Sequence, residues 1–385
     1  MAKTTIQQLA DYGQSAWLDY ISRSLLEGGK LKDLISQGLR GMTSNPSIFN
    51  QAISSSNDYD VKIAQLKGKG KSTFEIYDAL TIADIQDATD LFQPVYKATN
   101  GLDGYVSLEI NPKIAHKIDE QIEEGVRLFQ AVGRPNLMVK VPATREGFSV
   151  IEELTSRGIN VNATLIFSLE QYVFTVEAYL AGLTRLLKNK GQACLPAGRA
   201  DKVHSVASVF VSRVDTTIDD LLVVSMGSPQ KRAGKDESLQ SLKGKAAVAN
   251  CRVIFEQYQN FVNDQRYKTM ASQGANMQRV LWGSTSTKNP QYSDIKYVTE
   301  LIARPTVNTL PEKTLLAFLD HGRLQDSFIS SYSESKKILS DLKAQGIDIN
   351  SVCADLLRDG VKAFEDAFEA LLNAIEKKAA QLSIK

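Results

Sequence analysis

A lysine stands in the middle of an apolar stretch at residues 137–143, LMVKVPA. Side chains alternate across a β-strand, so Lys140 and Met138 share one face of this expected strand. A stretch this apolar is typical of parallel strands, which are covered on both faces, and Lys140 would then point into protein. A buried ammonium needs an acidic partner or loses its proton easily, so Lys140 is a candidate nucleophile for a Schiff base with a carbonyl substrate. The alternative is that Lys140 lies at a strand end and extends into solvent.

Two carboxylates occupy comparable positions in other apolar stretches. Asp19 lies near the end of residues 16–20, and Glu109 lies toward the end of residues 104–112. A Schiff base forms with loss of water, which requires an acid or base near the lysine, and carbon–carbon cleavage requires a base for a hydroxyl proton. Each such proton transfer typically contributes ~10²–10⁴-fold to the rate. The alternatives are that Asp19 caps the next helix and that Glu109 forms a purely structural ion pair with Lys140.

Other polar side chains also fall at expected strand ends. Asn45 precedes Pro46, which favours an extended Asn45 and a helix that opens at the proline. Asn162 and Thr164 share one face of residues 158–167. Such groups can hold substrate hydroxyls and orient a catalytic water, or the asparagines can be ordinary turn residues. A ring of buried polar groups usually marks a site rather than a core. The expected set is Asp19, Thr43, Asn45, Glu109, Lys140, Asn162, Thr164, Ser208 and Arg213.

Eight apolar stretches alternate with helical patterns along the chain. This alternation predicts a parallel sheet, and a count of eight favours an α/β fold of the (β/α)8 TIM barrel type, in which the strand ends meet at one face. We expect a single domain over residues 1–385, with extra N- and C-terminal helices and surface insertions. An open doubly wound sheet is the alternative, although the glycine-rich first turn usual in that fold is missing. The expected strands are residues 16–20, 42–47, 104–112, 137–143, 158–167, 203–211, 280–285 and 305–310.

The helices follow from apolar residues at helical spacing. Thr4 or Thr5 is expected to cap a first helix that ends at Tyr12. Residues 67–71 and 189–201, the latter including Cys194, are expected to be loops. A solvated surface insertion is expected at residues 227–244. The other helices are expected near residues 25–35, 74–92, 113–129, 146–157, 168–188, 214–225, 246–262, 293–303 and 352–375.

The composition excludes several classes of protein. The 45 Lys and Arg residues nearly balance 44 Asp and Glu residues, so neither nucleic acid nor a membrane surface is an expected partner. Three widely spaced cysteines argue against a disulfide framework or a clustered metal site. The amino terminus lacks the apolar core of a secretory signal, and no stretch has the roughly 18 apolar residues of a membrane span. We therefore expect a cytoplasmic protein.

Several motifs together resemble those of the transaldolase family. Residues 43–49, TSNPSIF, and 137–144, LMVKVPAT, look like its two signature stretches, and residues 107–112, 160–167 and 208–213 match as well. The resemblance runs in consistent order from Trp17 to at least Arg213, and is to the long bacterial branch. Some members of that branch are fused to glucose-6-phosphate isomerase, for which 385 residues leave no room. It implies a class I aldolase-type barrel of the pentose phosphate pathway that acts on sugar phosphates, as a monomer or homodimer, without a metal or organic cofactor.

The resemblance also implies a role for individual residues. Lys140 would be the Schiff-base nucleophile, Glu109 the acid and base acting through a water held by Thr164, and Asp19 the base for carbon–carbon cleavage. Asn45 and Asn162 would bind the dihydroxyacetone portion, and Ser208 and Arg213 would hold the substrate phosphate. Thr43 is a further expected substrate-binding residue.

The chain departs from the family pattern after the seventh strand. A Ser-x-Arg phosphate pair is usual there, whereas residues 283–288 read GSTSTK. Lys288 is expected to supply the second phosphate charge, with Thr285 as a weaker candidate. Because lysine is a point charge where arginine binds bidentately, phosphate affinity is the property that this change would alter.

The resemblance implies transfer of a dihydroxyacetone unit from a ketose phosphate, sedoheptulose 7-phosphate or fructose 6-phosphate, to an aldose phosphate, glyceraldehyde 3-phosphate or erythrose 4-phosphate. One alternative is a fructose-6-phosphate-type aldolase that releases free dihydroxyacetone. Another is a sugar-phosphate-binding barrel without catalysis, although a binding protein needs no nucleophile.

Overall fold

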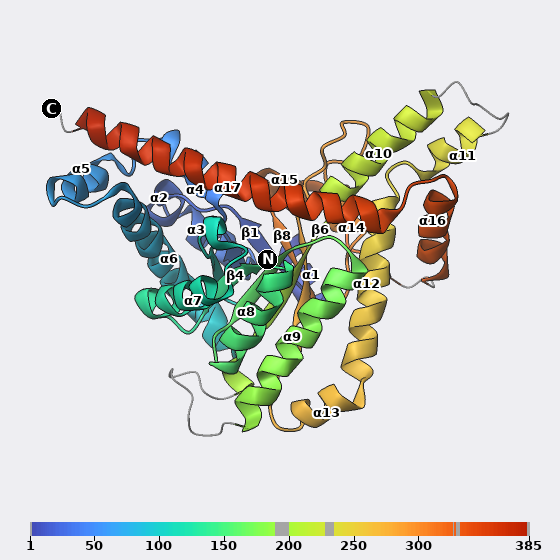
Figure 1. Ribbon diagram of the computed structural model, residues 1–385, viewed down its shortest axis with the longest axis horizontal. Coiled ribbons are helices and arrows are strands. Elements are labelled where there is room, and N and C mark those ends of the chain that lie inside the picture. Colours follow the sequence, from blue (N-terminus) through green and yellow to red (C-terminus); the bar gives the residue numbers. More distant parts are fainter. Residues whose placement is uncertain (1, 189–199, 228–234, 326, 329–331, 383–385) are drawn as a thin grey trace.

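Eight parallel strands close into a barrel in sequence order, with β8 paired to β1. The computed structural model describes residues 2–188, 200–227, 235–325, 327–328 and 332–382, and helices surround the barrel (Figure 1). The predicted (β/α)8 barrel is thus confirmed, and the open doubly wound sheet was the wrong alternative. The strands are β1 (Gln14–Asp19), β2 (Gly41–Thr43), β3 (Val106–Glu109), β4 (Leu137–Pro142), β5 (Val161–Ile166), β6 (Ser205–Phe210), β7 (Arg279–Gly283) and β8 (Thr306–Leu310).

The register of the central strands places the predicted chemistry side by side. Glu109 on β3 is the neighbour of Lys140 on β4, and Lys140 is the neighbour of Asn162 on β5. Met138, two residues before Lys140, belongs to an apolar cluster that is separate from the main core. The other members of this cluster are Trp17, Tyr105, Val206, Leu281 and Val307, each on a strand or beside one. Lys140 therefore continues the inward face, as its spacing predicts.

A buried ion pair lies near the amino ends of the strands. Arg279 at the start of β7 approaches the Asp103 carboxylate to 2.9 Å, and Ser15 on β1 donates to the same carboxylate at 2.8 Å. Arg279 also donates to Ser15. These contacts pair Ser15, Asp103 and Arg279 at the amino end of the barrel, opposite the end at which the polar residues predicted for the site lie.

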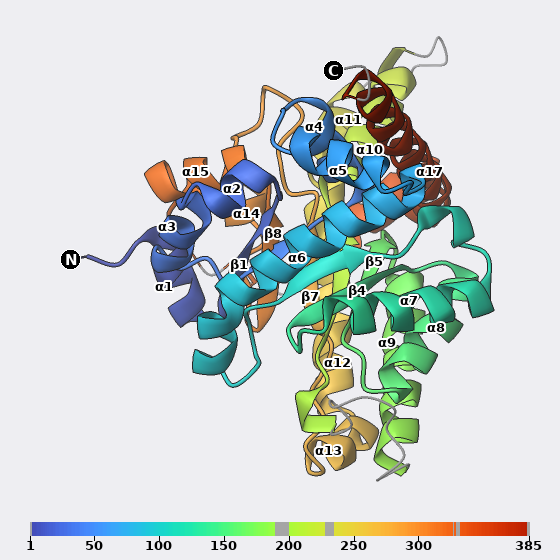
Figure 2. The ribbon, with the colours of Figure 1, turned by 90° about the vertical axis from the view of Figure 1, so that its left-hand side faces the viewer.

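Helices separate successive strands, as expected for this fold, and others extend the chain at both ends (Figures 1 and 2). Thr4 caps the first helix, and Pro94 lies within the long α6. The helices are α1 (Thr5–Tyr12), α2 (Arg23–Glu27), α3 (Lys30–Ser36), α4 (Pro46–Ser54), α5 (Asp60–Gly68), α6 (Thr73–Ala98), η1 (Pro112–Ile114), α7 (Ile118–Val132), α8 (Arg145–Ser156), α9 (Leu169–Lys188), η2 (Ala200–Lys202), α10 (Ser212–Gly227), α11 (Lys235–Leu242), α12 (Ala246–Asn263), α13 (Gln265–Ala271), α14 (Lys296–Thr299), α15 (Glu312–His321), α16 (Ser333–Ala344) and α17 (Ile349–Leu382).

Some helical expectations were wrong in detail. The helix expected at residues 25–35 is divided into α2 and α3 by Gly29, whose φ of 81° favours glycine. The helix expected at residues 113–129 is a single 3₁₀ turn followed by α7, because the extended Lys117 separates the two. Lys67 and Gly68, expected in a loop, form the end of α5. The helix expected at residues 293–303 is reduced to the four residues of α14.

The insertion expected at residues 227–244 packs on the protein in part. Its residues 235–242 form α11, whose Leu239 is fully buried, and the Gly244 amide donates to the Asp219 carboxylate on α10 at 2.8 Å. The buried side chains of Leu239 and Leu242 and one backbone contact thus anchor a segment that its polar composition concealed. Residues 228–234 and 189–199, with Cys194, lie outside the described residues. Among the described cysteines, Cys251 and Cys353 are buried and unpaired.

The long C-terminal helix α17 crosses the molecule over the barrel (Figures 1 and 2). It contacts α4, α5, α6, α10 and β5. Gly360 permits a close approach, because a Cβ there would lie 3.1 Å from Leu165 in the irregular part of β5. Toward its other end, Lys378 Nζ pairs with Asp60 on α5 at 2.6 Å. No helix among the described residues is long and apolar enough to cross a membrane.

Candidate active site

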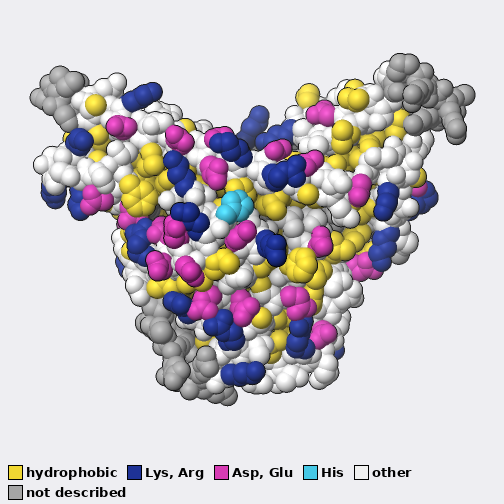
Figure 3. Space-filling view, in the orientation of Figure 1, with side chains coloured by type: hydrophobic (Ala, Val, Ile, Leu, Met, Phe, Trp, Pro, Cys, Tyr) yellow, Lys and Arg dark blue, Asp and Glu magenta, His cyan; other side chains and the backbone are white. Residues whose placement is uncertain are grey.

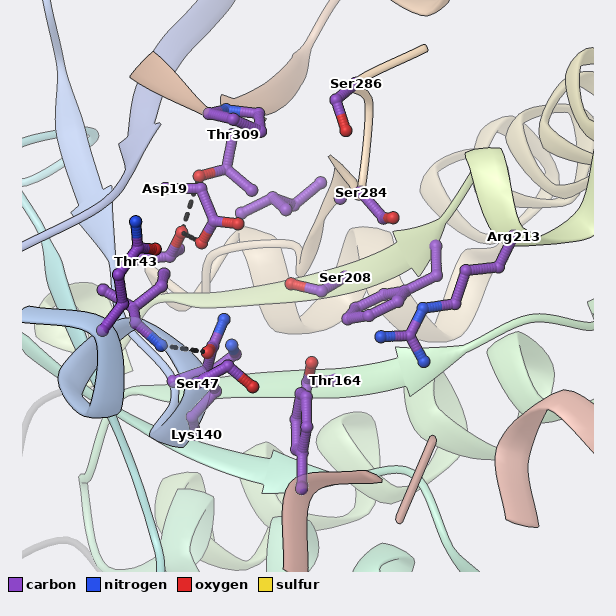
Figure 4. Close-up of a pocket in the computed structure, with 18 of the residues that line it drawn as sticks. Asp19, Thr43, Ser47, Lys140, Thr164, Ser208, Arg213, Ser284, Ser286 and Thr309 are labelled. Atoms are coloured by element: carbon purple, nitrogen blue, oxygen red, sulfur yellow. Dashed lines mark hydrogen bonds between the residues drawn. The ribbon is translucent and has the colours of Figure 1, made fainter. Parts of the chain in front are cut away.

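A cavity of about 220 Å³ opens where the carboxyl ends of the strands meet (Figure 4). Eight of the ten residues predicted for the site line it; these are Asp19, Thr43, Asn45, Lys140, Thr164, Ser208, Arg213 and Lys288. The other two, Glu109 and Asn162, are not part of the cavity wall. Each is the strand neighbour of Lys140, which does line the cavity. The barrel therefore brings together side chains that are up to 269 positions apart in the sequence, from Asp19 to Lys288.

Lys140 is buried, with only 4% of its surface exposed, so the alternative of a side chain that extends into solvent is wrong. Its Nζ donates to the Ser44 carbonyl at 3.1 Å and lies 3.6 Å from Glu109 Oε2. The ring centroid of Phe364, on α17, is 5.9 Å from the same Nζ. The amine is thus held by a carbonyl, a carboxyl group and an aromatic ring while it faces the cavity.

Glu109 is 6% exposed and lines a second, apolar cavity that α17 covers. Burial raises its pKa to about 7, although Lys140 opposes this rise. Its Oε2 and the Oγ1 of Thr164 are both buried and without a hydrogen-bond partner among the described residues. Glu109 and Lys140 do form the close pair that the structural alternative predicted, but a carboxyl group with this pKa exchanges protons readily at neutral pH.

Asp19 is held by a chain of hydroxyl groups. Thr43 Oγ1 donates to Asp19 Oδ1 at 2.6 Å, and the hydroxyls of Thr43 and Thr309 are 2.6 Å apart (Figure 4). Burial raises the pKa of Asp19, while Lys140 and Thr43 lower it. The helix after β1 is capped by Ser22 instead, so the alternative of Asp19 as a helix cap is wrong.

The two asparagines have different positions. Asn45 is extended and caps α4 through its amide oxygen, with Pro46 in the first turn, as the sequence predicts. Because the cap uses the oxygen, the NH2 group of Asn45 is the part that can donate to a substrate hydroxyl. Asn162 is fully buried; it donates to Ser107 and accepts from Ser208 Oγ at 2.6 Å. Asn162 therefore orients Ser208 at the cavity wall.

Cationic and hydroxyl groups lie toward α10 and the segment after β7. Arg213 lies in the first turn of α10, 5.7 Å from the Phe210 ring centroid, and points into the cavity (Figure 4). The exposed Lys288 donates to Ser286 at 2.8 Å. Thr285 is fully buried and donates to Asn308. The expectation that Thr285 is a weaker candidate for the second phosphate ligand was therefore wrong. This end of the cavity can bind an anion.

Sequence reasoning missed several residues of the cavity wall. Ser284 and Ser286 line it on either side of the buried Thr285, and the alternation GSTSTK was the available signal. Phe364 had no such signal, because its apolar spacing indicates only a buried helix face. The remaining unpredicted wall residues are Ser47, Ile48, Gln51, Phe210, Leu281, Gly283, Thr309 and Pro311.

Among the described residues, no three His, Cys, Asp or Glu side chains are grouped so that they could hold a metal ion. A lysine nucleophile on an inner barrel strand needs nearby carboxyl groups for its proton transfers, and Lys140 has both Glu109 and Asp19. The fold and site together define a (β/α)8-barrel protein with a buried lysine and two carboxyl groups at the carboxyl end of its strands.

Comparison with known proteins shows the family to which the chain belongs. The family described as Transaldolase/Fructose-6-phosphate aldolase matches residues 16–375. A protein named Transaldolase from Trichodesmium erythraeum is 41% identical over the full length of both chains, and one named Transaldolase 2 from a Nostoc species is 40% identical, also over both full lengths. A Transaldolase from Saccharopolyspora erythraea is 42% identical over 98% of each chain. The chain belongs to the transaldolase/fructose-6-phosphate aldolase family, which is a family of enzymes.

Proposed function

We propose that the protein is a transaldolase that transfers a dihydroxyacetone unit between a ketose phosphate and an aldose phosphate through a Schiff base on Lys140. The observation that carries this proposal is the buried Lys140 amine, 3.6 Å from a Glu109 carboxyl group whose pKa is about 7. The donor would be sedoheptulose 7-phosphate or fructose 6-phosphate, and the acceptor glyceraldehyde 3-phosphate or erythrose 4-phosphate. Family membership supports the same activity.

The first half of the reaction forms and uses the imine. The neutral Lys140 amine bonds to C2 of the ketose, and the C2 oxygen leaves as water after Glu109 supplies a proton, directly or through a water bound to Thr164. The iminium then accepts the electrons of the C3–C4 bond while Asp19 takes the proton of the C4 hydroxyl. The bond breaks, the shortened aldose leaves, and three carbons remain on Lys140 as an enamine.

The second half reverses these steps with a different aldose. The enamine carbon bonds to the aldehyde carbon, Asp19 returns its proton to the new hydroxyl, and water releases the longer ketose from Lys140. Because the three-carbon intermediate must outlast the departure of the first product, the proposal implies ping-pong kinetics.

The cavity wall supports binding of a phosphorylated sugar. Asn45, Thr43 and Asn162 would hold hydroxyls of the dihydroxyacetone portion; Asn45 and Thr43 line the cavity together with Asp19, and Asn162 is the strand neighbour of Lys140. Arg213 and Lys288 would pair with the phosphate. In the present arrangement Ser208 donates to Asn162, so its hydroxyl would turn to donate to a phosphate oxygen.

We also propose that the whole chain acts as one catalytic domain, as a cytoplasmic monomer or homodimer without a metal or cofactor. The near-zero net charge supports small-molecule partners rather than nucleic acid or a membrane surface, and the face in Figure 3 mixes both signs of charge. Size-exclusion chromatography with light scattering tests the oligomeric state, and unchanged turnover after dialysis against a chelator tests the independence from metal.

Borohydride trapping tests the chemistry. Protonation of the enamine carbon gives a three-carbon iminium, and its reduction by borohydride in the presence of fructose 6-phosphate is expected to leave a three-carbon adduct on Lys140, identified by peptide mass spectrometry. The matched variant Lys140→Arg keeps the positive charge but lacks the primary amine, and no adduct is expected. An adduct on another lysine, or none on the unchanged protein, would overturn the proposal.

The product balance separates a transferase from an aldolase. A transferase consumes fructose 6-phosphate at an appreciable rate only when erythrose 4-phosphate is present, and yields sedoheptulose 7-phosphate. Steady release of free dihydroxyacetone without the acceptor would assign the aldolase reaction instead. Binding of the sugar phosphate without any turnover would leave only the non-catalytic barrel.

A further inference from the structure

Helix α17 contributes one side chain to both cavities at the carboxyl end of the barrel. Phe364 lines the polar cavity that contains Lys140 and Asp19, and it also lines the apolar cavity that contains Glu109. Its side chain is nearly buried, so it is a shared wall between the two rather than a side chain on the rim. Figure 4 shows the red ribbon of α17 at the edge of the pocket, next to Thr164.

The surroundings of Glu109 are apolar apart from the site itself. The residues that line its cavity are Ile110, Pro112, Ala115, Pro142, Leu165, Val361 and Phe364. Two of these, Val361 and Phe364, come from α17. The other residues that line this cavity belong to the barrel strands or to the loops after them. A large ring in this position excludes water from the carboxyl group beside it.

Simple packing does not account for this position of Phe364. The apolar stripe of α17 continues on to Phe368 and Leu371, which are also buried, but these two line neither cavity. Phe368 packs edge-on against Tyr77 of α6 with ring centroids 5.0 Å apart. Phe364 is the member of the stripe whose ring lies 5.9 Å from Lys140 Nζ. Its contact is with the reacting groups.

We propose that Phe364 is a positioning residue for the reaction: its ring seals the Glu109 carboxyl group from solvent and holds that group against Lys140, so that α17 is a working part of the active site. This inference rests on the proposed function, since it presumes that Glu109 supplies the proton for imine formation. Phe364 itself transfers no proton.

The electrostatics of Glu109 agree with this geometry. Burial is the largest cause of its raised pKa, which is about 7, and Asp19 on β1 raises it further, while Lys140 on β4 lowers it. Tyr77 on α6 is the other titratable group that interacts with Glu109. Water admitted by a smaller side chain at position 364 would stabilise the carboxylate, so the pKa of Glu109 would fall toward its ordinary value. A protonated acid would then be scarce at neutral pH.

The test is the pH dependence of kcat/KM for the full-length protein with fructose 6-phosphate and erythrose 4-phosphate. When Glu109 acts as an acid, activity is present below its pKa and lost above it, so its titration forms the alkaline limb of the profile. In Phe364→Ala this limb is expected to move to lower pH by about one unit or more, which is about a tenfold loss at pH 8. Phe364→Leu keeps part of the apolar cover and is expected to move the limb less, in the same direction.

Leu371→Ala is the matched control. It removes another fully buried side chain from the same stripe of α17, so it weakens the packing of the helix without opening either cavity. Its unfolding temperature is expected to fall, but the alkaline limb is expected to stay in place. If Phe364→Ala does not fold, the comparison of Phe364→Leu with Leu371→Ala decides the question.

The outcomes distinguish this inference from the proposed function. If the alkaline limb of the pH profile does not move in the folded Phe364 variants, while borohydride still traps Lys140 in the unchanged protein, the role of Phe364 is overturned and the proposed function is not. An equal shift in Leu371→Ala also overturns it, because general loosening of α17 would then be the cause. A failure to trap Lys140 in the unchanged protein overturns the proposed function first.

Discussion

Replacing Asp19 by asparagine separates the two stages that the proposed mechanism assigns to different carboxyl groups. Asparagine keeps a carbonyl oxygen that can accept the 2.6 Å hydrogen bond from Thr43, so the position of the side chain is expected to persist. What is lost is the base that takes the C4 hydroxyl proton. Glu109 and Lys140 are untouched, and imine formation is therefore expected to continue.

The magnitude follows from the single proton transfer that is removed. Loss of a positioned base typically slows its step ~10²–10⁴-fold, equivalent to about 3–5 kcal/mol of activation free energy. Cleavage would then be the slowest step of the cycle, and kcat would fall by nearly the same factor. KM for the ketose phosphate is expected to change little, because Asn45, Arg213 and Lys288 remain in the cavity wall.

The assay is borohydride trapping with fructose 6-phosphate, read by the mass of the adduct on Lys140. The unchanged protein is expected to carry three carbons, because cleavage precedes trapping. Asp19→Asn is expected to carry the intact six-carbon phosphate, since its imine forms but does not cleave. A three-carbon adduct formed at the normal rate would refute the role of Asp19 as the base. The absence of any adduct would instead assign Asp19 to imine formation.

Thr43→Val provides a graded comparison. It removes the hydroxyl that donates to Asp19 while it leaves the carboxylate in place. An intermediate loss of kcat is expected, with a three-carbon adduct still formed. A loss equal to that of Asp19→Asn would indicate that orientation of the carboxylate, rather than its basicity, limits the cleavage step.

Three further predictions address the acid, the phosphate and the fold. Glu109→Gln is expected to slow imine formation by ~10²–10⁴-fold and to remove the alkaline limb near pH 7 from the pH profile of kcat/KM. That limb arises because the protonated acid is lost above its pKa of about 7. Persistence of the limb would assign it to another group. Lys288→Ala is expected to raise KM for phosphorylated substrates several-fold with little change in kcat, because the exposed ammonium adds binding but touches no reacting atom; an unchanged KM would exclude it from the phosphate site. Leu239→Ala is expected to lower the free energy of unfolding by about 2–5 kcal/mol in urea titrations, since this side chain is fully buried. A change near zero would show that Leu239 does not anchor α11.

The sequence was sufficient for the strands that bear the chemistry. Alternation along residues 137–143 predicted an inward Lys140, and Pro46 predicted the extended Asn45 at the start of α4; both predictions were confirmed. These features are local, because strand periodicity and the restriction before proline act over a few residues. Order along the chain then placed the strands, since neighbours in a barrel of this type are also neighbours in sequence.

The parts that the sequence did not reveal depend on contacts distant along the chain. The spacing of apolar residues indicated that Phe364 faces a core, but not that α17 crosses the barrel mouth and places this ring near Lys140. In the same way, α11 is held by the buried Leu239 and by the hydrogen bond from the Gly244 amide to the Asp219 carboxylate. Neither contact can be predicted from the local sequence pattern. After β7, Ser284 adopts a φ of 54°, and this turn sets which hydroxyls face the cavity.

The roles proposed for the two carboxyl groups agree with what surrounds each of them. Asp19 accepts from Thr43 and faces the polar cavity; burial raises its pKa, while Lys140 and the hydroxyl donor oppose this rise. Glu109 has one oxygen without a hydrogen-bond partner and is enclosed by apolar side chains, so its proton is held to about neutral pH. Both lie close to Lys140, which lowers the pKa of each, so the lysine alone does not distinguish them. What differs between them is the threonine hydroxyl beside Asp19 and the apolar cover that α17 supplies over Glu109, and the proposed base and acid roles rest on this difference.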